Sequence, residues 1–401
     1  MPSDRRPIVA PLSRRALLGG ALGLTVTGGF GRLAQAAGGA AAERILVLLE
    51  LNGGNDSLNM VVPYADPAYR RARPGLAIGR DAVAQLDERL GLNRALEPLM
   101  PSWQGGELAV ALGVGYPRPN RSHFRSIEIW NSASDSEQVI TEGWVNRLFA
   151  AAPQEGGAGA TDAVVLGGPS GPLLGPALRT VVMRQPERFL QRAANVGEGA
   201  AEGSNPALDH ILGVRSDVTA AAEEIEAHLE RAPKIAVEMP EGRLGRQLEN
   251  AARLILAGVP LSAIKVAQSG YDTHAGQAGR QRKLLTELSA ALAAFRAALI
   301  QGGAWDRVLV MTYAEFGRRV AENASGGTDH GTAAAHLVLG GRVRGGLIGE
   351  QPSLTALDGG DLRHRLDFRR LYATAAHRWW SLPQVPGGPF DGFAPLDLIA
   401  A

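Results

Sequence analysis

Acidic and imidazole side chains follow an apolar run near the C-terminal end of this sequence. Glu315 comes shortly after residues 308–311, and Asp329 and His330 lie in the glycine-flanked turn beyond it. An apolar, β-branched run of this kind is typical of a buried strand in a parallel sheet. Ligands in such sheets bind beyond the carboxyl ends of the strands. We therefore expect these three side chains at a ligand-binding edge.

A second pair of potential ligands follows another apolar run. Asp272 and His274 lie two residues apart in a loop bounded by glycines, so that both can reach one ion. Carboxylates and imidazoles together suit a hard or borderline metal. We expect a divalent metal, with Zn favoured and Ca, Mg or Mn as alternatives. The other interpretation of this pair is a hydrogen-bonded loop without metal.

A hydroxyl and basic residues precede a predicted helix. Ser122 stands at the predicted helix start, where it is either an N-cap or a nucleophile, and His123 follows it as a second candidate catalytic residue. Arg121 and Arg125 flank them and would suit an anionic substrate group, although simple solvation also explains them.

The first predicted strand, residues 44–51, ends in the turn Asn-Gly-Gly-Asn-Asp-Ser. Asp56 in this turn is a candidate metal ligand, and Asn55 beside it is a candidate substrate-binding residue. The alternative is that Asp56 only caps the next segment. Late in the chain His336 is a spare candidate ligand, although its apolar surroundings favour a core position.

The elements that must position these residues alternate steadily along the chain. Strands are predicted at residues 44–51, 107–113, 161–167, 263–268, 308–311 and 333–341, and helices at 67–73, 92–103, from 122, 142–151, 244–256, 277–300 and 367–380. This alternation predicts an α/β fold with a mainly parallel sheet covered by helices on both faces. Residues 342–362 are predicted to form a loop, and residues 184–241 a helical insertion or lid.

Composition limits the class of protein and its compartment. The chain has 401 residues, no Cys, 5% aromatic residues and a formal net charge of +1, which gives no basis for nucleic-acid binding. Residues 1–36 combine arginines, an apolar run and a small-residue cleavage site, which indicates a twin-arginine signal peptide, with a membrane anchor as the alternative. We expect a single domain at 37–401 without a membrane span, exported to the periplasm or secreted through the twin-arginine machinery.

Five short motifs in order carry a resemblance to known proteins. They are residues 51–59 (LNGGNDSLN), 121–125 (RSHFR), 270–274 (GYDTH), 314–318 (AEFGR) and 327–331 (GTDHG). With them the chain resembles the alkaline phosphatase and sulfatase superfamily. More closely, it resembles an uncharacterised bacterial family of twin-arginine-exported proteins placed in that superfamily. The resemblance implies an alkaline-phosphatase-like fold over most of the predicted mature chain.

The resemblance also implies roles for individual residues. Asp56 would bind a second metal, Ser122 would be the nucleophile, and Asp272 and His274 would bind the first metal. In one register Asp329 and His330 form the superfamily's Asp-His pair on the second metal.

In the other register, which we favour, Glu315 and Phe316 occupy that place and His330 is a late ligand of the first metal. Phe316 cannot bind a metal, so this register implies a weakened or missing second site. The spacing of Asp272 and His274 is also shorter than the superfamily's Asp-x-x-x-His.

These features together predict an exported metal-dependent hydrolase of phosphate or sulfate esters that uses a serine nucleophile. Its substrate would be a small-molecule or polysaccharide ester. The alternative is a catalytically weakened or inactive exported protein of the same fold that binds a surface polysaccharide or a partner protein.

Overall fold

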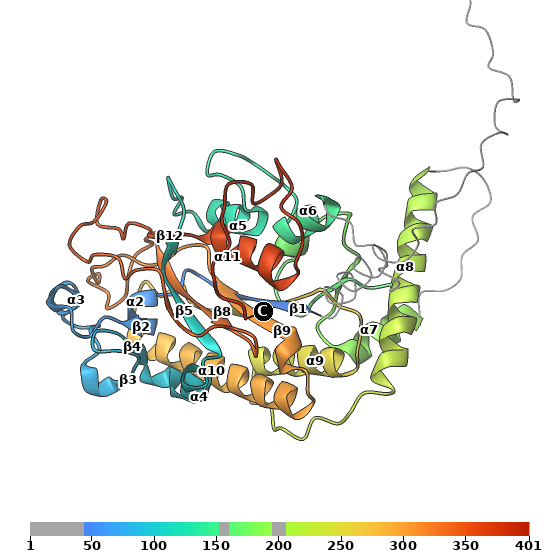
Figure 1. Cartoon of the computed structure of the whole chain (residues 1–401), viewed down its shortest axis with the longest axis horizontal. Coiled ribbons are helices and arrows are strands. Elements are labelled where there is room, and N and C mark those ends of the chain that lie inside the picture. The colour runs from blue at the N-terminus through green and yellow to red at the C-terminus, as the bar shows by residue number, and fades with distance from the viewer. Residues whose placement is uncertain (1–43, 152–159, 195–205, 401) are drawn as a thin grey trace, which may run out of the picture.

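A computed structural model describes residues 44–151, 160–194 and 206–400 of the chain (Figure 1). The predicted signal peptide and the whole glycine-rich stretch within the predicted insertion, at residues 197–205, lie outside the described residues.

Nine strands form the central sheet. Along the main path their order is β11 (Gly346–Ile348), β5 (Leu108–Gly115), β10 (Ala334–Leu339), β9 (Val308–Tyr313), β1 (Ile45–Asn52), β8 (Ala263–Ser269), β6 (Ala163–Val165) and β7 (Thr180–Val182), and β12 (Leu366–Asp367) pairs with β5. Strand β1 lies between β9 and β8 and is parallel to both, and all eight residues of β1 except Asn52 are buried. The predicted mainly parallel sheet is confirmed.

Strand β10 is the only strand of this described sheet that runs against its neighbours, since it is antiparallel to both β5 and β9. It therefore begins at the edge where β1, β5, β8 and β9 end. The connection between β9 and β10, residues 314–333, consequently stays at this carboxyl edge. This reversal brings the turn with His330 to the same edge as the loops that follow β1, β5 and β8.

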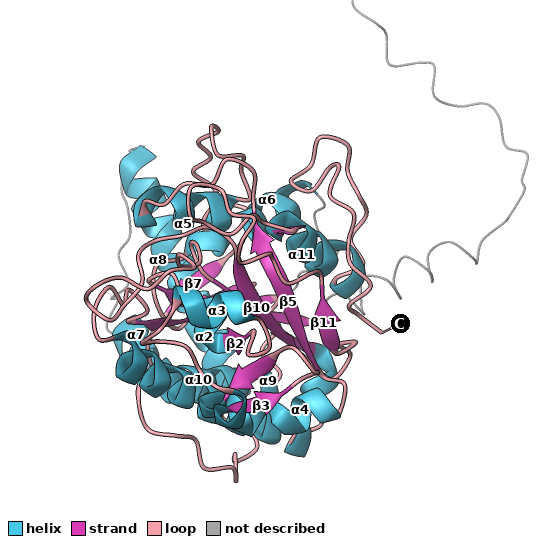
Figure 2. Ribbon diagram, turned by 90° about the vertical axis from the view of Figure 1, so that its left-hand side faces the viewer, coloured by secondary structure: helices cyan, strands magenta, loops and turns pink. Residues whose placement is uncertain are grey.

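Helices cover both faces of the sheet, as predicted (Figures 1 and 2). On one face, Val47 and Leu49 of β1 share a core with α9 (Arg243–Leu256) and α10 (Gln277–Gln301). On the other face, Leu46 and Leu48 share a core with α5 (His123–Ser132), α6 (Trp144–Ala151) and α11 (Phe368–Thr374). Successive side chains of a strand point to opposite faces, so β1 contributes to both cores.

Smaller elements complete the described chain. Strands β2 (Val61–Val62), β4 (Gly91–Asn93) and β3 (Val83–Gln85) form a second sheet, and the remaining helices are α2 (Ser57–Met60), α3 (Pro67–Ala72), α4 (Met100–Gln104), α7 (Pro186–Ala194) and α8 (Pro206–Leu229). Short 3-10 turns span Arg80–Ala82, Arg94–Leu99, Gly171–Leu173 and Trp305–Arg307, and a π-helical turn spans Ala375–Trp379.

Two of the predicted elements are wrong in detail. The helix predicted at 92–103 is divided into β4, a 3-10 turn and α4, with Pro98 inside the turn. A proline lacks the N–H that a continuous helix needs, which explains the division. The segment predicted as loop at 342–362 contains β11, which pairs with β5.

One described helix, α10, is long and apolar enough to cross a membrane by length and composition alone, although we expected no such segment. Core helices of soluble proteins pass the same test. Leu285, Leu288 and Phe295 of α10 are fully buried in the core beside α9.

Candidate functional site

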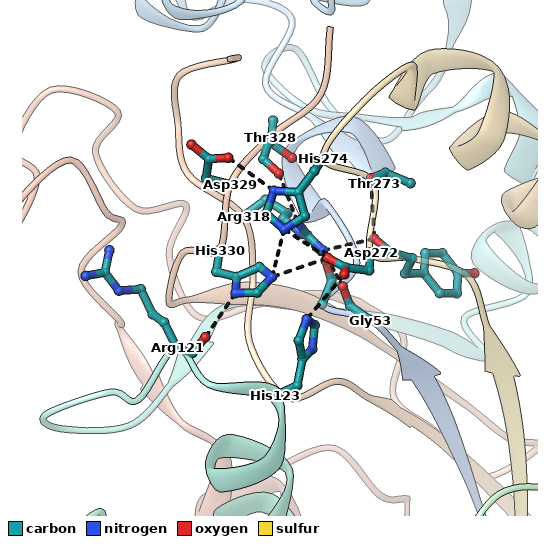
Figure 3. A network of polar contacts seen from close by, with 12 residues as sticks. Gly53, Arg121, His123, Asp272, Thr273, His274, Arg318, Thr328, Asp329 and His330 are labelled. Atoms are coloured by element: carbon teal, nitrogen blue, oxygen red, sulfur yellow. Dashed lines mark hydrogen bonds and ion pairs between the residues drawn. The ribbon is translucent and has the colours of Figure 1, made fainter. Parts of the chain in front are cut away.

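Three polar side chains converge at the carboxyl edge of the sheet (Figure 3). The Nε2 atoms of His274 and His330 are 2.9 Å apart, and they lie 3.1 and 3.2 Å from Oδ1 of Asp272. Asp272 and His274 come from the loop after β8, and His330 comes from the turn before β10. The structure thus brings together the three residues predicted to hold the first metal.

His123 joins this cluster from the first turn of α5. Its Nε2 lies 3.5 Å from Oδ2 of Asp272, and its ring meets the ring of His330 edge to face with centroids 4.4 Å apart. His123, Asp272 and His330 can each offer one ligand atom such that all three atoms lie within 4.8 Å of one another. This spacing fits a metal site, and the sequence had suggested a catalytic role for His123 instead.

Each of the three imidazoles has its Nδ1 atom fixed by an oxygen acceptor. His123 Nδ1 donates to Oε1 of Glu315 at 2.7 Å, His274 Nδ1 donates to Oδ1 of Asp329 at 3.1 Å, and His330 Nδ1 donates to the carbonyl of Arg121 at 3.0 Å. Metal-binding histidines commonly donate their other ring nitrogen in this way, which fixes the tautomer and the ring orientation. The three Nε2 atoms are left for a shared partner.

The electrostatics of the cluster favour a cation. Burial lowers the pKa of His330. Burial by itself would raise the pKa of Asp272, but Arg318 and then His330 outweigh it and lower the pKa to about 2. The hydrogen bond with Glu315 raises the pKa of His123. Electron-rich nitrogen and oxygen atoms at these distances need a proton or a metal ion between them.

Glu315 is buried at the floor of this site. Its Oε1 accepts hydrogen bonds from His123 and from the Gly53 N–H at 2.9 Å, while its Oε2 is buried without a hydrogen-bond partner among the described residues. In the structure the carboxylate therefore orients His123 directly. Its predicted role as a metal ligand itself stays a prediction.

Two residues to which the sequence analysis gave no ligand or catalytic role shape the site. Arg318 is fully buried and donates to Oδ1 of Asp272 at 2.6 Å and to backbone carbonyls that include those of Gly54 and Thr328. Phe316 packs its ring against those of His123 and His330, with centroids 4.9 and 4.6 Å apart. The buried Arg318 follows the AEFG sequence directly, but no sequence pattern indicates its burial.

Asp56 and Asn55 do not join the cluster. The Asp56 carboxylate is 1% exposed, forms an ion pair with the buried Arg73, and accepts hydrogen bonds from Gln277 and from the backbone N–H of Leu58. The contact with Leu58 is the capping role considered as the alternative. Asn55 is buried and accepts a hydrogen bond from Gln281 at 3.0 Å. Their predicted metal and substrate roles gain no support from these contacts.

The remaining predicted residues lie around the start of α5. Ser122 is exposed at the N-cap position and makes no side-chain capping bond, so its hydroxyl is available. The Arg121 guanidinium points away from the cluster and binds Asp361 at 3.0 Å (Figure 3). Arg125 donates to the carbonyls of Ser136 and Gln138. Neither arginine faces the cluster, and their substrate-binding roles stay predictions.

His336 lies in β10, away from this cluster. Its ring is 1% exposed and packs edge to face on Trp130, and neither of its nitrogens has a hydrogen-bond partner within the part of the chain that the structure describes. Burial lowers its pKa to about 3.

A cleft of about 460 Å³ opens beside the cluster. Its wall includes His123, Asp272, Gly53 and Glu315, and it continues past them toward the ends of β1 and α5. The candidate metal site therefore has room for a ligand next to it. Fold and site together define an α/β protein with a candidate metal centre at the carboxyl edge of its sheet.

A comparison with known protein families identifies the family of this chain. The model of a family described as protein of unknown function (DUF1501) matches residues 89–384. The chain belongs to this family. No curated protein sequence matches the chain.

Several solved structures show a distant likeness in fold. A sulfatase from Pseudoalteromonas, PsFucS1, has 9% identity and a TM-score of 0.40, and the match covers 91% of this chain and 74% of that one. The C-terminal periplasmic domain of EptC from Escherichia coli, in complex with Zn, has 9% identity, a TM-score of 0.37 and coverage of 74% and 72%. The phosphonate monoester hydrolase of Agrobacterium radiobacter has 9% identity, a TM-score of 0.33 and coverage of 74% and 68%. At these identities and scores no residue role can be transferred.

Proposed function

We propose that this protein is a metal-dependent hydrolase of phosphate or sulfate esters with a single metal centre. The ligands would be the Nε2 atoms of His123, His274 and His330 and the carboxylate of Asp272. The observation that carries the proposal is the shared arrangement of the three imidazoles, in which every Nδ1 is held by an acceptor and every Nε2 faces the carboxylate.

The donor set favours zinc among the divalent metals. Three nitrogen donors and one carboxylate suit Zn²⁺, whereas Ca²⁺ and Mg²⁺ prefer sites made of oxygen ligands. A second metal at Asp56 is not part of the proposal, because Arg73 already neutralises that buried carboxylate. Phe316, which packs against two of the ligand rings, is consistent with one metal ion.

The chemistry of the site follows from its neighbours. A bound metal supplies a Lewis acid that polarises the ester and offsets its negative charge. Ser122 precedes the proposed ligand His123 directly, and its exposed hydroxyl would attack the phosphorus or sulfur atom. The bond from phosphorus or sulfur to the ester oxygen would break, the proton of the serine hydroxyl would pass to that oxygen, and the alcohol would leave. Water would then release phosphate or sulfate and restore the serine. The cleft would hold the organic part of the ester.

Export is the second component of the proposal. Residues 1–36 carry the twin-arginine pattern, so the hydrolase would act in the periplasm or outside the cell. Cell fractionation checks this: the chain should reach the periplasm or the medium, and replacement of both Arg14 and Arg15 by Lys should retain it in the cytoplasm.

The decisive experiment combines metal analysis with an ester panel on the purified protein. We expect one Zn per chain, its loss with a strong chelator, and chelator-sensitive cleavage of aryl phosphates or aryl sulfates. Ser122→Ala should lose turnover and keep the metal, while the control Ser325→Ala, at another exposed serine, should keep both. Absence of metal from a protein offered Zn, or full hydrolysis by the Ser122 variant, would overturn the metal centre or the nucleophile respectively.

A further inference from the structure

Besides the proposed metal ligands, the cleft is lined by residues of two chemical kinds, which we call its polar and apolar walls. One wall is polar and comes from β1 and the end of α5, with Glu50, Asn52 and Asn131. The other wall is apolar and comes from Phe124 and Ile127 of α5 and from Pro169. None of these six residues has a part in the proposed hydrolysis.

The polar wall is built on a buried ion pair. Glu50 is 3% exposed, and its Oε2 binds the fully buried Lys265 ammonium at 2.6 Å. Its Oε1 accepts a hydrogen bond from the amide of Asn52 at 3.0 Å. Asn131 Oδ1 accepts from the Tyr313 hydroxyl at 3.4 Å. These contacts fix the three side chains while leaving further acceptor sites on Glu50 and amide groups of Asn52 and Asn131 for hydroxyl groups of a ligand.

The apolar wall contains an unusual exposed ring. Phe124 is 84% exposed, the most exposed of the large hydrophobic side chains for which the structure gives an exposure. An exposed phenylalanine contributes little to the core, but at the rim of a cleft it offers a flat face for the C–H groups of a ligand ring. Ile127 is half-buried one turn further along α5 and extends this wall into the cleft.

The charges around the cleft argue against a second anionic group on the ligand. No arginine or lysine is among the described residues that line it. The nearby cations are already engaged: Lys265 by Glu50, Arg318 by Asp272 and Arg121 by Asp361. A nucleotide with additional phosphates would find no cationic partner along these walls, whereas a neutral group would leave no charge unpaired.

From this combination we infer that the part of the cleft lined by these residues binds an uncharged sugar or cyclic polyol ring, with its hydroxyl edge on Glu50, Asn52 and Asn131 and its C–H face on Phe124. The inference rests on the proposed function, because it assigns the alcohol part of the ester. It makes Phe124 and Asn131 residues that determine substrate specificity.

The test measures binding without turnover. Methyl glucoside, a neutral sugar ring without an ester, is titrated into the Zn-loaded full chain by calorimetry and by saturation-transfer NMR. We expect methyl glucoside to bind, Phe124→Ala to weaken its binding about fivefold, and Asn131→Ala to weaken it by a similar factor. The matched control is Val139→Ala, which removes another exposed apolar side chain, 74% exposed and outside the cleft wall, and should bind as the wild type does.

Each outcome separates this inference from the proposed hydrolysis. Sugar binding that depends on Phe124, in a protein that cleaves no ester, supports the sugar site and rejects the hydrolase. Ester cleavage without any binding of methyl glucoside, or binding unchanged in both cleft variants, overturns the sugar site and leaves the hydrolase intact.

Discussion

Replacing Glu315 by Gln isolates the contribution of the carboxylate that orients one proposed ligand. Gln keeps the size of the buried side chain and can keep the acceptor for both the Gly53 N–H and Nδ1 of His123, which lie 2.9 and 2.7 Å from Oε1. It removes the negative charge that raises the pKa of His123. The fold should therefore persist while His123 becomes a weaker donor.

The expected loss of metal affinity depends on how many imidazoles keep a hydrogen-bond acceptor at Nδ1. Loss of an outer hydrogen-bond partner weakens metal binding by about 10- to 100-fold. Two of the three imidazoles keep their acceptors, Asp329 and the Arg121 carbonyl, and Gln retains an oxygen at the third. We therefore expect the Zn affinity of Glu315→Gln to fall by the lower end of this range, about tenfold or about 1.4 kcal/mol.

The assay is competition for Zn between the full chain and a chelator of known affinity, with thermal unfolding as the check that the variant folds. Asp329→Asn serves as the graded control: Asp329 is 54% exposed and lies farther from its histidine, at 3.1 Å, so its effect should be smaller. Protons compete with the metal for His123, so wild-type affinity should fall as the pH drops through the raised pKa of His123. In Glu315→Gln this fall should begin at lower pH. Equal Zn affinity of Glu315→Gln and wild type would refute the role of this carboxylate.

Three further predictions concern buried polar groups. The depressed pKa of His336, about 3 in the fold against 6.5, means that the unfolded chain binds the extra proton, so stability should fall by about 1.4 kcal/mol per pH unit from pH 6.5 down to about 3. In His336→Leu this part of the slope should vanish in urea titrations at pH 5 and pH 7, and an unchanged slope would contradict it. Arg318→Lys should lower the free energy of unfolding by about 3 kcal/mol, because Lys cannot reproduce the fork that binds Asp272 and several carbonyls at once; a change within error in chemical denaturation would argue against that account. Asp56→Ala should cost about 3 kcal/mol or more by leaving Arg73 buried without its counter-charge, yet keep one Zn per chain, and loss of the metal there would restore Asp56 as a ligand.

Local pattern was sufficient for most of the framework. The strands predicted at 44–51, 107–113, 263–268 and 308–311 correspond to β1, β5, β8 and β9. They could be predicted because continuous apolar runs are typical of fully buried parallel strands. The start of α5 after Ser122 was also predictable from the residue types at that boundary. Because parallel strands end at one edge, the same reasoning anticipated that Asp272, His274 and His330 would meet.

The sequence by itself determined which polar residues reach the carboxyl edge, whereas only the tertiary structure decided which of them share a site. Partner choice depends on contacts between distant segments: His123 meets Glu315 across 192 positions, and Arg318 meets Asp272 across 46. On sequence grounds Asp56 could bind a metal or a guanidinium equally well. In the structure Arg73 is buried beside it and forms the ion pair with its carboxylate. A buried charge must be paired where it lies, so the packing of the chain, and not the residue type, assigns each carboxylate its role.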